Sequence, residues 1–448
     1  MPRKLDKILI SYKQPDFLAK LDAVYLSKAG MSHFGLGPKH FDNRQKVEEI
    51  IRALVERGDE AVVDYTETFD GVKLTPDQFR VSDGDLETAH KKIAPELLDS
   101  IRKAIENVKR YQKEILVNKD KKCSAGTGIK YTPISRIGIC VPGASAPLPS
   151  TVIMTAVPAQ VAGVEEIVVV SPPRYDNDIH PVTLAACWEL GIKEVYRIGG
   201  AQAVAALSFG TKTIERVDKI VGPGNQWVQT AKKLVFGDVA VDSIAGPSEV
   251  LIIANEQANP AWVAADMLSQ AEHAPGCAYL FTVSQKIADE VLEELKKQLE
   301  QLKHKDETLA CLEKSSGIVV FRDMPDLIER ANQFAAEHLQ IQCGAESKKI
   351  ADKIKNAGAI FVGEYSPVAV GDYWAGPSHT LPTGISAQFF SALSANDFIK
   401  STSIIEYDKA KLAESAQDII RLAEAEGLDA HAKSIKIRQQ QDPSSFPV

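Results

Sequence analysis

Side chains with types and spacings that suit metal binding or proton transfer occur at four places along the chain. At the first, Gln270 and His273 lie three positions apart near the end of an amphipathic segment. Positions i and i+3 share one face of a helix, so both side chains can reach one ion. Zinc binds imidazole nitrogen and side-chain oxygen ligands, which predicts a zinc site here. A histidine that caps the carbonyls of its own helix end explains the same residues, and the pair alone does not decide.

The second place holds an adjacent acid and imidazole, Glu337 and His338, at the junction between a helical and a β-branched segment. The ends of secondary-structure elements are where α/β sheets present functional groups. Two neighbouring bases of different pKa suit a reaction that removes several protons. A solvated helix end with an ordinary acid and histidine is the alternative.

The third and fourth places lie nearer the C-terminus. Residues 371–383 carry Asp372 and His379 in a loop made rigid by two glycines and two prolines. Rigid loops on a scaffold often carry functional groups, and this segment is long and irregular for a purely structural turn. Glu426 and His431 lie in a charged helical segment, where a solvated helix face is the ordinary interpretation.

A glycine-rich segment at residues 222–225 precedes the helical segment 226–235. It lacks the third glycine of the GxGxxG fingerprint, so it does not identify a dinucleotide site by itself. Backbone amides at the start of the following helix can still bind an anion.

These candidate residues are carried by two runs of alternating strands and helices. In the first run, strands are expected at 165–173 and 193–200, each followed by a helix. The second run has five expected strands, at 249–255, 278–284, 317–323, 338–343 and 359–364. Such alternation is typical of parallel sheets covered by helices. The fold class predicted is therefore α/β, with two Rossmann-like parallel-sheet domains, an N-terminal arm and a helical C-terminal tail.

Four regions follow from this pattern. We expect an extended arm over residues 1–44, a first α/β domain formed by 45–136 with 248–382, and a second α/β domain over 137–247. Metal and catalytic bases are expected in the first domain and NAD on the second. Residues 383–448 are expected to be a helical tail. The tail is too polar for a core of its own and is predicted to dock on another surface, in the same or a partner subunit.

Composition limits the class of protein. The 448 residues carry a net charge of -8 and show no long basic stretch, which argues against nucleic acid as a partner. The six cysteines are scattered without a CxxC pair, as in a reduced intracellular protein. We find no secretory signal and no apolar run of the roughly 18 residues needed to span a bilayer. The expected location is the cytoplasm, without membrane association.

Eight stretches, in their order and spacing, resemble the histidinol dehydrogenase family over almost the whole chain. They are ERGDEAVVDYTETFDG, YTPISRIGICVPG, GGAQAVAAL, VGPGNQWVQTAKKLVFG, AGPSEVLIIAN, AADMLSQAEH, AAEHLQI and VGDYWAGPSHTLPT. Together they are highly specific, although each of the four places is a weak signal alone.

The resemblance implies a role for each candidate. The zinc ligands would be Gln270, His273, Asp372 and His431, with the last contributed by the neighbouring subunit of a homodimer. The proton acceptors would be Glu337 and His338. The substrate would be contacted by the zinc ligands and by Ser248, His338, His379 and Glu426, and NAD by Cys140, Gln202 and Asn225.

The implied reaction is a four-electron oxidation of L-histidinol through histidinal to L-histidine. Zinc would hold the substrate, His338 would take the hydroxyl proton in the first hydride transfer, and Glu337 would activate water for the second. The bound aldehyde would not leak.

The chain departs from the family pattern at five positions. Cys140 stands where a Tyr is usual, and Ala144 where a Gly is usual. The others are Ser378 for Asn, Ile385 for Gly and Gln388 for Arg. We expect these changes near the substrate and cofactor face, so an enzyme of this type that oxidises another amino alcohol or a sulfonated diol is an alternative. An inactive paralogue that binds a small molecule is a second alternative, and a metal-independent dehydrogenase is a third.

Overall fold

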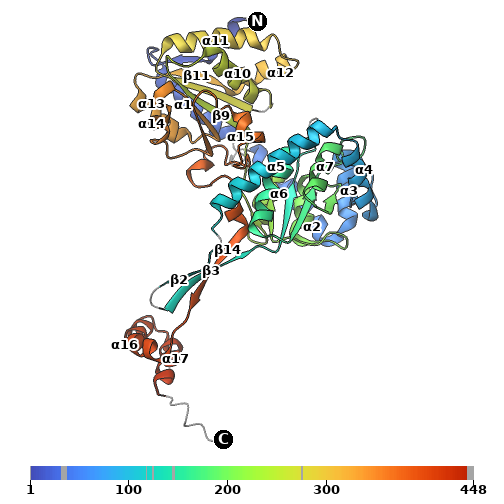
Figure 1. The fold of residues 1–448 in the computed structure, drawn as a ribbon, viewed down its shortest axis with the longest axis vertical. Coiled ribbons are helices and arrows are strands. Elements are labelled where there is room, and N and C mark those ends of the chain that lie inside the picture. The colour runs from blue at the N-terminus through green and yellow to red at the C-terminus, as the bar shows by residue number, and fades with distance from the viewer. Residues whose placement is uncertain are drawn as a thin grey trace. The chain divides into compact units, whose positions relative to one another are not determined.

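The computed structural model describes residues 2–31, 38–117, 119–123, 126–143, 147–273 and 276–440. The chain divides into two units. We call Met1–Leu116 with Pro133–Phe398 the main unit, and Val117–Thr132 with Ile399–Val448 the tail unit. The main unit contains two parallel sheets, coloured from blue to orange in Figure 1. No helix in the described part of the chain is long and apolar enough to cross a membrane.

The larger sheet has six parallel strands in the order β1-β11-β10-β9-β12-β13. Their bounds are β1 Leu9–Ser11, β9 Ser248–Ala254, β10 Gly276–Thr282, β11 Gly317–Val320, β12 His338–Gln342 and β13 Ala359–Val362. The central strands are buried on both faces, as expected for a parallel sheet covered by helices.

Helices cover both faces of this sheet. One apolar core lies under α10 Pro260–Ala271, α11 Gln285–Leu299 and α12 Lys305–Ser315. The opposite core lies under α1 Phe17–Met31, α13 Met324–Phe334 and α14 Ser347–Ala351. The loop region beyond β13 holds α15 Val368–Tyr373 and the short 3₁₀ turns Ser386–Gln388 and Ala395–Phe398.

The smaller sheet has five parallel strands in the order β6-β5-β4-β7-β8. Their bounds are β4 Arg136–Cys140, β5 Glu166–Val170, β6 Glu194–Tyr196, β7 Lys219–Val221 and β8 Ala240–Val241. In chain order this is 3-2-1-4-5, the arrangement of a Rossmann-type dinucleotide-binding sheet. The sequence therefore predicted that both sheets are parallel, but in the smaller sheet it indicated β5 and β6 and not β4, β7 or β8.

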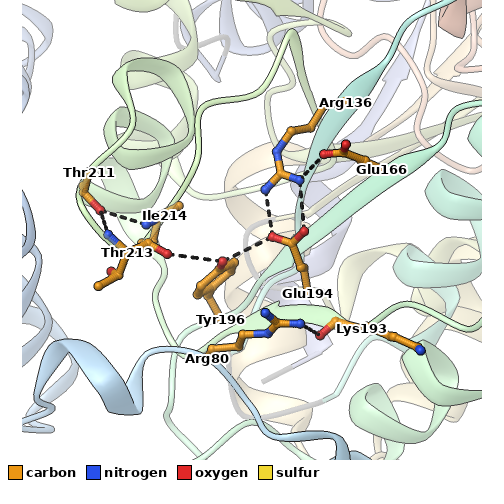
Figure 2. Close-up of polar contacts among 9 residues, drawn as sticks. All are labelled: Arg80, Arg136, Glu166, Lys193, Glu194, Tyr196, Thr211, Thr213 and Ile214. Carbon is orange, nitrogen blue, oxygen red and sulfur yellow. Dashed lines mark hydrogen bonds and ion pairs between the residues drawn. The ribbon is translucent and has the colours of Figure 1, made fainter.

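Eight helices cover the smaller sheet. One face carries α4 Asp83–Lys91, α5 Pro95–Ile115, α6 Pro149–Ala162 and α7 Pro181–Glu189. The other face carries α2 Pro38–Arg57, α3 Asp59–Asp70, α8 Gly200–Phe209 and α9 Gln226–Val235. At the amino ends of the strands of the smaller sheet, Arg136 forms ion pairs with Glu166 and Glu194, as Figure 2 shows.

The observed packing differs from the predicted domain boundaries in three respects. Residues 45–115 cover the smaller sheet, whereas we expected them with the larger one. An extended arm was expected over residues 1–44, but in the described residues 2–31 β1 adds an edge strand and α1 buries Leu21 and Val24 on the larger sheet. The sequence of an amphipathic helix shows which of its faces is buried but not which sheet that face packs on. The assignment of residues 45–115 to the larger sheet was therefore wrong.

The tail unit combines strands with helices. The strands β14 Ile399–Ile405, β3 Thr127–Pro133 and β2 Lys121–Cys123 form a three-stranded sheet, and α16 Lys409–Ala425 packs on α17 Asp429–Gln440. The helical tail was expected to begin at residue 383, but residues 383–398 belong to the main unit. The helix pair buries a core of only three residues, Ile420, Ala423 and Ala432.

Candidate functional site

A cavity of about 200 Å³ in the main unit collects most of the residues singled out from the sequence. It lies where the amino ends of β9 and β12 meet the loops that follow β7 and β8. The lining includes Ser248, His273, Glu337, His338, Asp372 and His379. We expected functional groups at strand ends, and the larger sheet presents them at the amino ends of its strands.

Glu337 is the buried carboxylate of this cavity. It is 6 % exposed, and its Oε2 accepts hydrogen bonds from the Ser248 hydroxyl and the Glu249 amide, both at 2.8 Å. Burial raises the pKa of the Glu337 carboxyl to about 7, despite those hydrogen bonds and the adjacent His338. A carboxyl with a pKa near neutrality can both release and accept a proton at physiological pH.

His338 begins β12 and is held in one orientation. Its Nδ1 lies 3.0 Å from the carbonyl oxygen of Glu249. A carbonyl oxygen only accepts, so Nδ1 carries the proton and Nε2 presents a lone pair. Nε2 is buried, has no hydrogen-bond partner among the described residues, and lies 3.8 Å from Asp372 Oδ1. An imidazole oriented in this way can accept a proton from a bound alcohol.

Glu249 is a residue that our reading of the sequence missed. It is 2 % exposed and makes three hydrogen bonds to the two bases. Its carbonyl oxygen accepts from His338 Nδ1, and its amide donates to the Glu337 carboxylate. Its side-chain Oε1 accepts from the Glu337 amide. The available signal was a charged residue at the start of an otherwise apolar strand. Glu249 orients both bases without lining the cavity.

The loop after β13 brings Asp372 and His379 to the same cavity. Asp372 lies near the end of α15, and its carboxylate is within reach of His338 Nε2. Burial lowers the pKa of the His379 imidazole, which is therefore neutral at pH 7. The loop forms one wall of the cavity, and the functional roles of Asp372 and His379 stay predictions.

Of the four predicted zinc ligands, three belong to the main unit. His273 and Asp372 line the cavity, while Gln270 is 2 % exposed one helical turn before His273, with no partner for its Nε2 in the described structure. Within the described residues, no cluster of three His, Cys, Asp or Glu side chains is arranged to hold a metal. The zinc site therefore stays a prediction.

Glu426 and His431 belong to the tail unit and are both exposed. Glu426 ends α16, and His431 lies in the first turn of α17. Their predicted contacts with substrate and zinc also stay predictions.

A buried ion pair supports the cavity wall formed by the smaller sheet. Lys232 is 1 % exposed and pairs with Asp242, while its Nζ also donates to the carbonyl of Gly222 at 3.0 Å. Asp242 accepts from the Gly222 amide at 2.7 Å. Gly222 has a φ of +104°, and a Cβ there would collide with the Cys140 carbonyl. The glycine-rich loop is thus fixed from beneath by a pair that the sequence did not reveal.

A second cavity, of about 120 Å³, opens at the carboxyl ends of β4 and β5. Two of the predicted NAD residues, Cys140 and Asn225, line it. The third, Gln202, is fully buried just behind, with both amide atoms unpartnered among the described residues. Asn225 caps α9 by accepting from the amides of Trp227 and Val228.

The departures from the family pattern are spread more widely than we expected. Cys140 lines the second cavity, and Ser378 lines a neighbouring one, where its hydroxyl donates to the Met154 carbonyl at 2.9 Å. Ile385 and Gln388 are exposed and line none of the cavities found in the described residues. Ala144 lies outside the described residues.

Comparisons with known proteins show the family to which the chain belongs. The family model for histidinol dehydrogenase matches residues 38–439. The chain is 48% identical over 398 residues to a histidinol dehydrogenase of Rhodopirellula baltica, covering 88% of this chain and 86% of that protein. It is 47% identical over 408 residues to a histidinol dehydrogenase of Oceanobacillus iheyensis, covering 89% and 95%. The crystal structure of histidinol dehydrogenase from Elizabethkingia anophelis superposes with a TM-score of 0.87 at 35% identity, over 96% of this chain and 97% of that one.

Proposed function

Because the chain belongs to the histidinol dehydrogenase family, we propose that it oxidises L-histidinol through histidinal to L-histidine, as a step of histidine biosynthesis. The alcohol loses a hydride and a proton to give the aldehyde. Water then adds, and the hydrate loses a second hydride to give the carboxylate. Each hydride reduces one NAD⁺. The observation that carries the proposal is the pair of buried bases, Glu337 and His338, in one cavity.

His338 is the base of the first oxidation in this proposal. Its protonated Nδ1 is bound to the Glu249 carbonyl, so the lone pair on Nε2 is directed away from that bond. Proton transfer from the substrate hydroxyl to Nε2 raises the electron density on the alcohol carbon as its hydride leaves.

Glu337 is the base of the second oxidation. Its carboxylate is held by Ser248 and the Glu249 amide, and its raised pKa makes it a stronger base than an exposed carboxylate. It removes a proton from the water that attacks the aldehyde. Since the base must be ionised, we expect aldehyde oxidation to increase as pH rises through about 7.

The residues present suit a zinc ion. Gln270 is buried and its Nε2 has no partner among the described residues, and the imidazole of His273 and the carboxylate of Asp372 line the cavity. These three side chains and His431 would hold the ion. When bound, zinc supplies a fixed positive charge that orients the substrate's amine and imidazole.

We also propose a homodimer in which His431 of the partner subunit completes the site. The tail unit supports this because Leu422 and Ile437 on its helices and Leu428 between them are exposed, and the helices bury a small core of their own. Partial burial of such side chains against a second copy would stabilise the tail. We further propose a cytoplasmic location, because the substrate and the product of the proposed reaction are small polar molecules.

The experiment is a substrate panel on the purified protein with its zinc content measured. We expect about one zinc per chain, NADH formation from L-histidinol, and loss of turnover after chelation. Faster turnover of another amino alcohol or of a sulfonated diol would identify that compound as the substrate. We would then expect Cys140 or Ser378 to be responsible for the changed specificity. Absence of both metal and turnover would contradict the proposal in favour of a binding protein.

One variant tests the division of roles between the two bases. We expect Glu337→Gln to slow histidinal oxidation more than histidinol oxidation, because only the second oxidation needs activated water. An equal loss on both substrates would contradict the division of roles.

A further inference from the structure

Three glutamines are buried between α10 and the larger sheet, next to an apolar core. Gln340 and Gln342 alternate along β12, so both side chains point to the same face of the sheet. In register they lie beside Ile252 and Ala254 of β9, which belong to the core under α10. The third glutamine, Gln270, lies on α10 itself. All three are buried, and a buried amide is costly unless its atoms form hydrogen bonds.

Most amide atoms of these glutamines have no hydrogen-bond partner among the described residues. The atoms without a partner are Nε2 and Oε1 of Gln340, Oε1 of Gln342 and Nε2 of Gln270. One bond is made, from Gln342 Nε2 to Asp266 Oδ2 at 2.7 Å. Asp266 lies on α10, one helical turn before Gln270. Buried polar atoms without partners are rare in proteins, so these need a physical explanation.

The direction of α10 brings Gln270 level with Gln340. This helix connects β9 to β10, and both strands are parallel to β12, so α10 runs opposite to β12. The bond between Asp266 and Gln342 fixes the register of the helix on the strand. Four residues further along α10, Gln270 lies about 6 Å from that level. Two residues back along β12, Gln340 lies about 6.6 Å from it, in the same direction.

Asp266 determines the direction in which hydrogen bonds can run through these side chains. Burial raises the pKa of the Asp266 carboxyl to about 6, while Gln342 and Gln340 act in the opposite direction. An ionised carboxylate only accepts hydrogen bonds, so each glutamine must present its Nε2 to it. With Nε2 on the side of Asp266, Gln340 has Oε1 left as an acceptor. The group on Gln270 that suits this acceptor is Nε2, which lacks a partner in the described structure.

We propose that Gln340 is a positioning residue for Gln270, the predicted zinc ligand. In the zinc-bound protein, Gln340 Nε2 donates to Asp266 and Gln340 Oε1 accepts from Gln270 Nε2. The remaining atom of the Gln270 amide, Oε1, is then directed to the ion, and oxygen is the amide atom that binds zinc. Partners of this kind orient a metal ligand and raise the affinity of the site. The inference rests on the proposed function, because it concerns the same zinc site.

The test is the zinc affinity of the Gln340→Met variant, measured on the full chain by competition with a chromogenic chelator. Methionine has a similar volume to glutamine and no amide. We expect zinc binding to weaken by about 10- to 100-fold, the usual effect of removing a partner of a metal ligand. Urea unfolding of the metal-free protein should show no loss of stability, because the substitution removes two buried atoms that have no described partner.

Gln342→Met is the matched control, since it removes an amide from the same face of the same strand. This variant breaks the described bond to Asp266, so we expect the metal-free protein to unfold at a lower urea concentration. Gln342 lies level with Asp266 and not with Gln270, so zinc affinity should stay within about threefold of the wild type. The two variants should therefore show opposite patterns of stability and zinc affinity, which a purely structural role of Gln340 would not produce.

Asp266→Asn supplies a second variant of unchanged size. An asparagine amide can donate as well as accept, so it no longer fixes the direction of the hydrogen bonds. We expect weaker zinc binding than in the wild type, with a smaller loss than in Gln340→Met. This variant decides the proposal if Gln340→Met does not fold, and unchanged zinc affinity in it would then overturn the proposal.

Three results would overturn the role of Gln340. One is unchanged zinc affinity in Gln340→Met, and another is an equal loss of zinc affinity in Gln340→Met and Gln342→Met. The third is a wild-type protein that binds no zinc. Zinc affinity is measured without substrate, so the result is independent of the substrate panel. If the wild type binds zinc but does not oxidise L-histidinol, the proposed function fails and the zinc affinities still decide the role of Gln340.

Discussion

The amino edges of the two parallel sheets both carry buried charge, but they use it differently. At the smaller sheet, Arg136, Glu166 and Glu194 each begin a strand, and the arginine's two terminal nitrogens donate to the two carboxylates at 2.5–3.0 Å (Figure 2). At the larger sheet, the strands begin with Ser248 and His338, and His338 Nε2 has no described partner.

The difference shows how to distinguish structural charge from reactive charge in one fold. Around Arg136, opposite charges favour ionisation: the pKa of Glu194 is lowered, first of all by its hydrogen bonds to Arg136. Around Glu337, burial outweighs the hydrogen bonds and the pKa is raised. An ion-paired cluster holds strands together, even though the buried Nε of Arg136 has no partner among the described residues, whereas a buried base with an unengaged lone pair is available to a substrate.

The largest effect on activity should come from the amino edge of the larger sheet, where His338 lies. We expect His338→Asn to lower kcat for histidinol oxidation by about 10²- to 10⁴-fold, the usual contribution of a general base. NADH formation measures the loss, and metal analysis should show zinc retained. The exposed His304 provides the control, since His304→Asn should be neutral. Near-normal turnover of His338→Asn would show that the base has been assigned to the wrong residue.

Breaking the ion-paired cluster at the amino edge of the smaller sheet should lower the stability of the protein. Arg136→Met removes the partner of Glu166 and Glu194, and we expect a loss of about 3 kcal/mol in the free energy of unfolding. Urea unfolding followed by circular dichroism measures this loss. Lys103→Met on α5 removes one partner of an exposed pair with Asp99, and should cost at most about 0.5 kcal/mol. Similar losses in both variants would mean that the cluster contributes no more than a surface pair.

The pH dependence of stability should have opposite sign at the two edges. Because the folded pKa of Glu337 is raised to about 7, its stabilising contribution is complete below the unfolded pKa of about 4.3 and is lost as pH rises through about 7. Glu337→Gln cannot ionise, so its free energy of unfolding should exceed that of the wild type by about 3 kcal/mol at pH 8 and should equal it at pH 4.

Glu194 gives the matched opposite case. Its folded pKa is lowered, so its contribution is present above the unfolded pKa and is lost as pH falls through the folded one. Glu194→Gln should therefore destabilise at pH 8 and converge with the wild type in acid. Parallel pH profiles for the two variants would remove the distinction between the edges.

The smallest expected effect on stability comes from a single hydroxyl at the amino edge of the smaller sheet. Tyr196 is buried, and its hydroxyl lies 3.2 Å from Glu194 Oε2 and 3.5 Å from the Thr213 carbonyl (Figure 2). We expect Tyr196→Phe to lose about 1 kcal/mol of stability with kcat unchanged. The exposed Tyr407 offers the same substitution without a buried partner, and Tyr407→Phe should be neutral. A fall in kcat would connect this edge to the chemistry.

Some elements could be predicted and others could not, for identifiable reasons. The β-branched segment at residues 166–170 and the long amphipathic segment at 95–115 signal their own structure. The central strand β4 was not expected, because its residues run directly into a Gly/Pro-rich loop. The short strands of the tail unit were missed for lack of buried alternation: β2 is exposed throughout.

The site shows the same division. Glu337, His338 and the loop with Asp372 could be selected from residue type and family resemblance, and they do line one cavity. Glu249 was visible only as a charged residue at the start of an apolar strand, and its role depends on strand register: β12 pairs with β9 so that His338 lies opposite Val250, next to the Glu249 carbonyl. Lys232 and Asp242 were missed because a lysine in a helix is normally solvated, and only the packing of α9 on the sheet buries it.

The sequence by itself determined the alternation of strands and helices, the family, and the types of side chain available for chemistry, because these depend on local periodicity and on motifs. Tertiary structure alone decided which sheet each helix covers, which strand edge carries the bases, and which charged side chains form ion pairs. Those properties depend on contacts between residues far apart in the chain, and burial sets the pKa of Glu337 only after such contacts have excluded water.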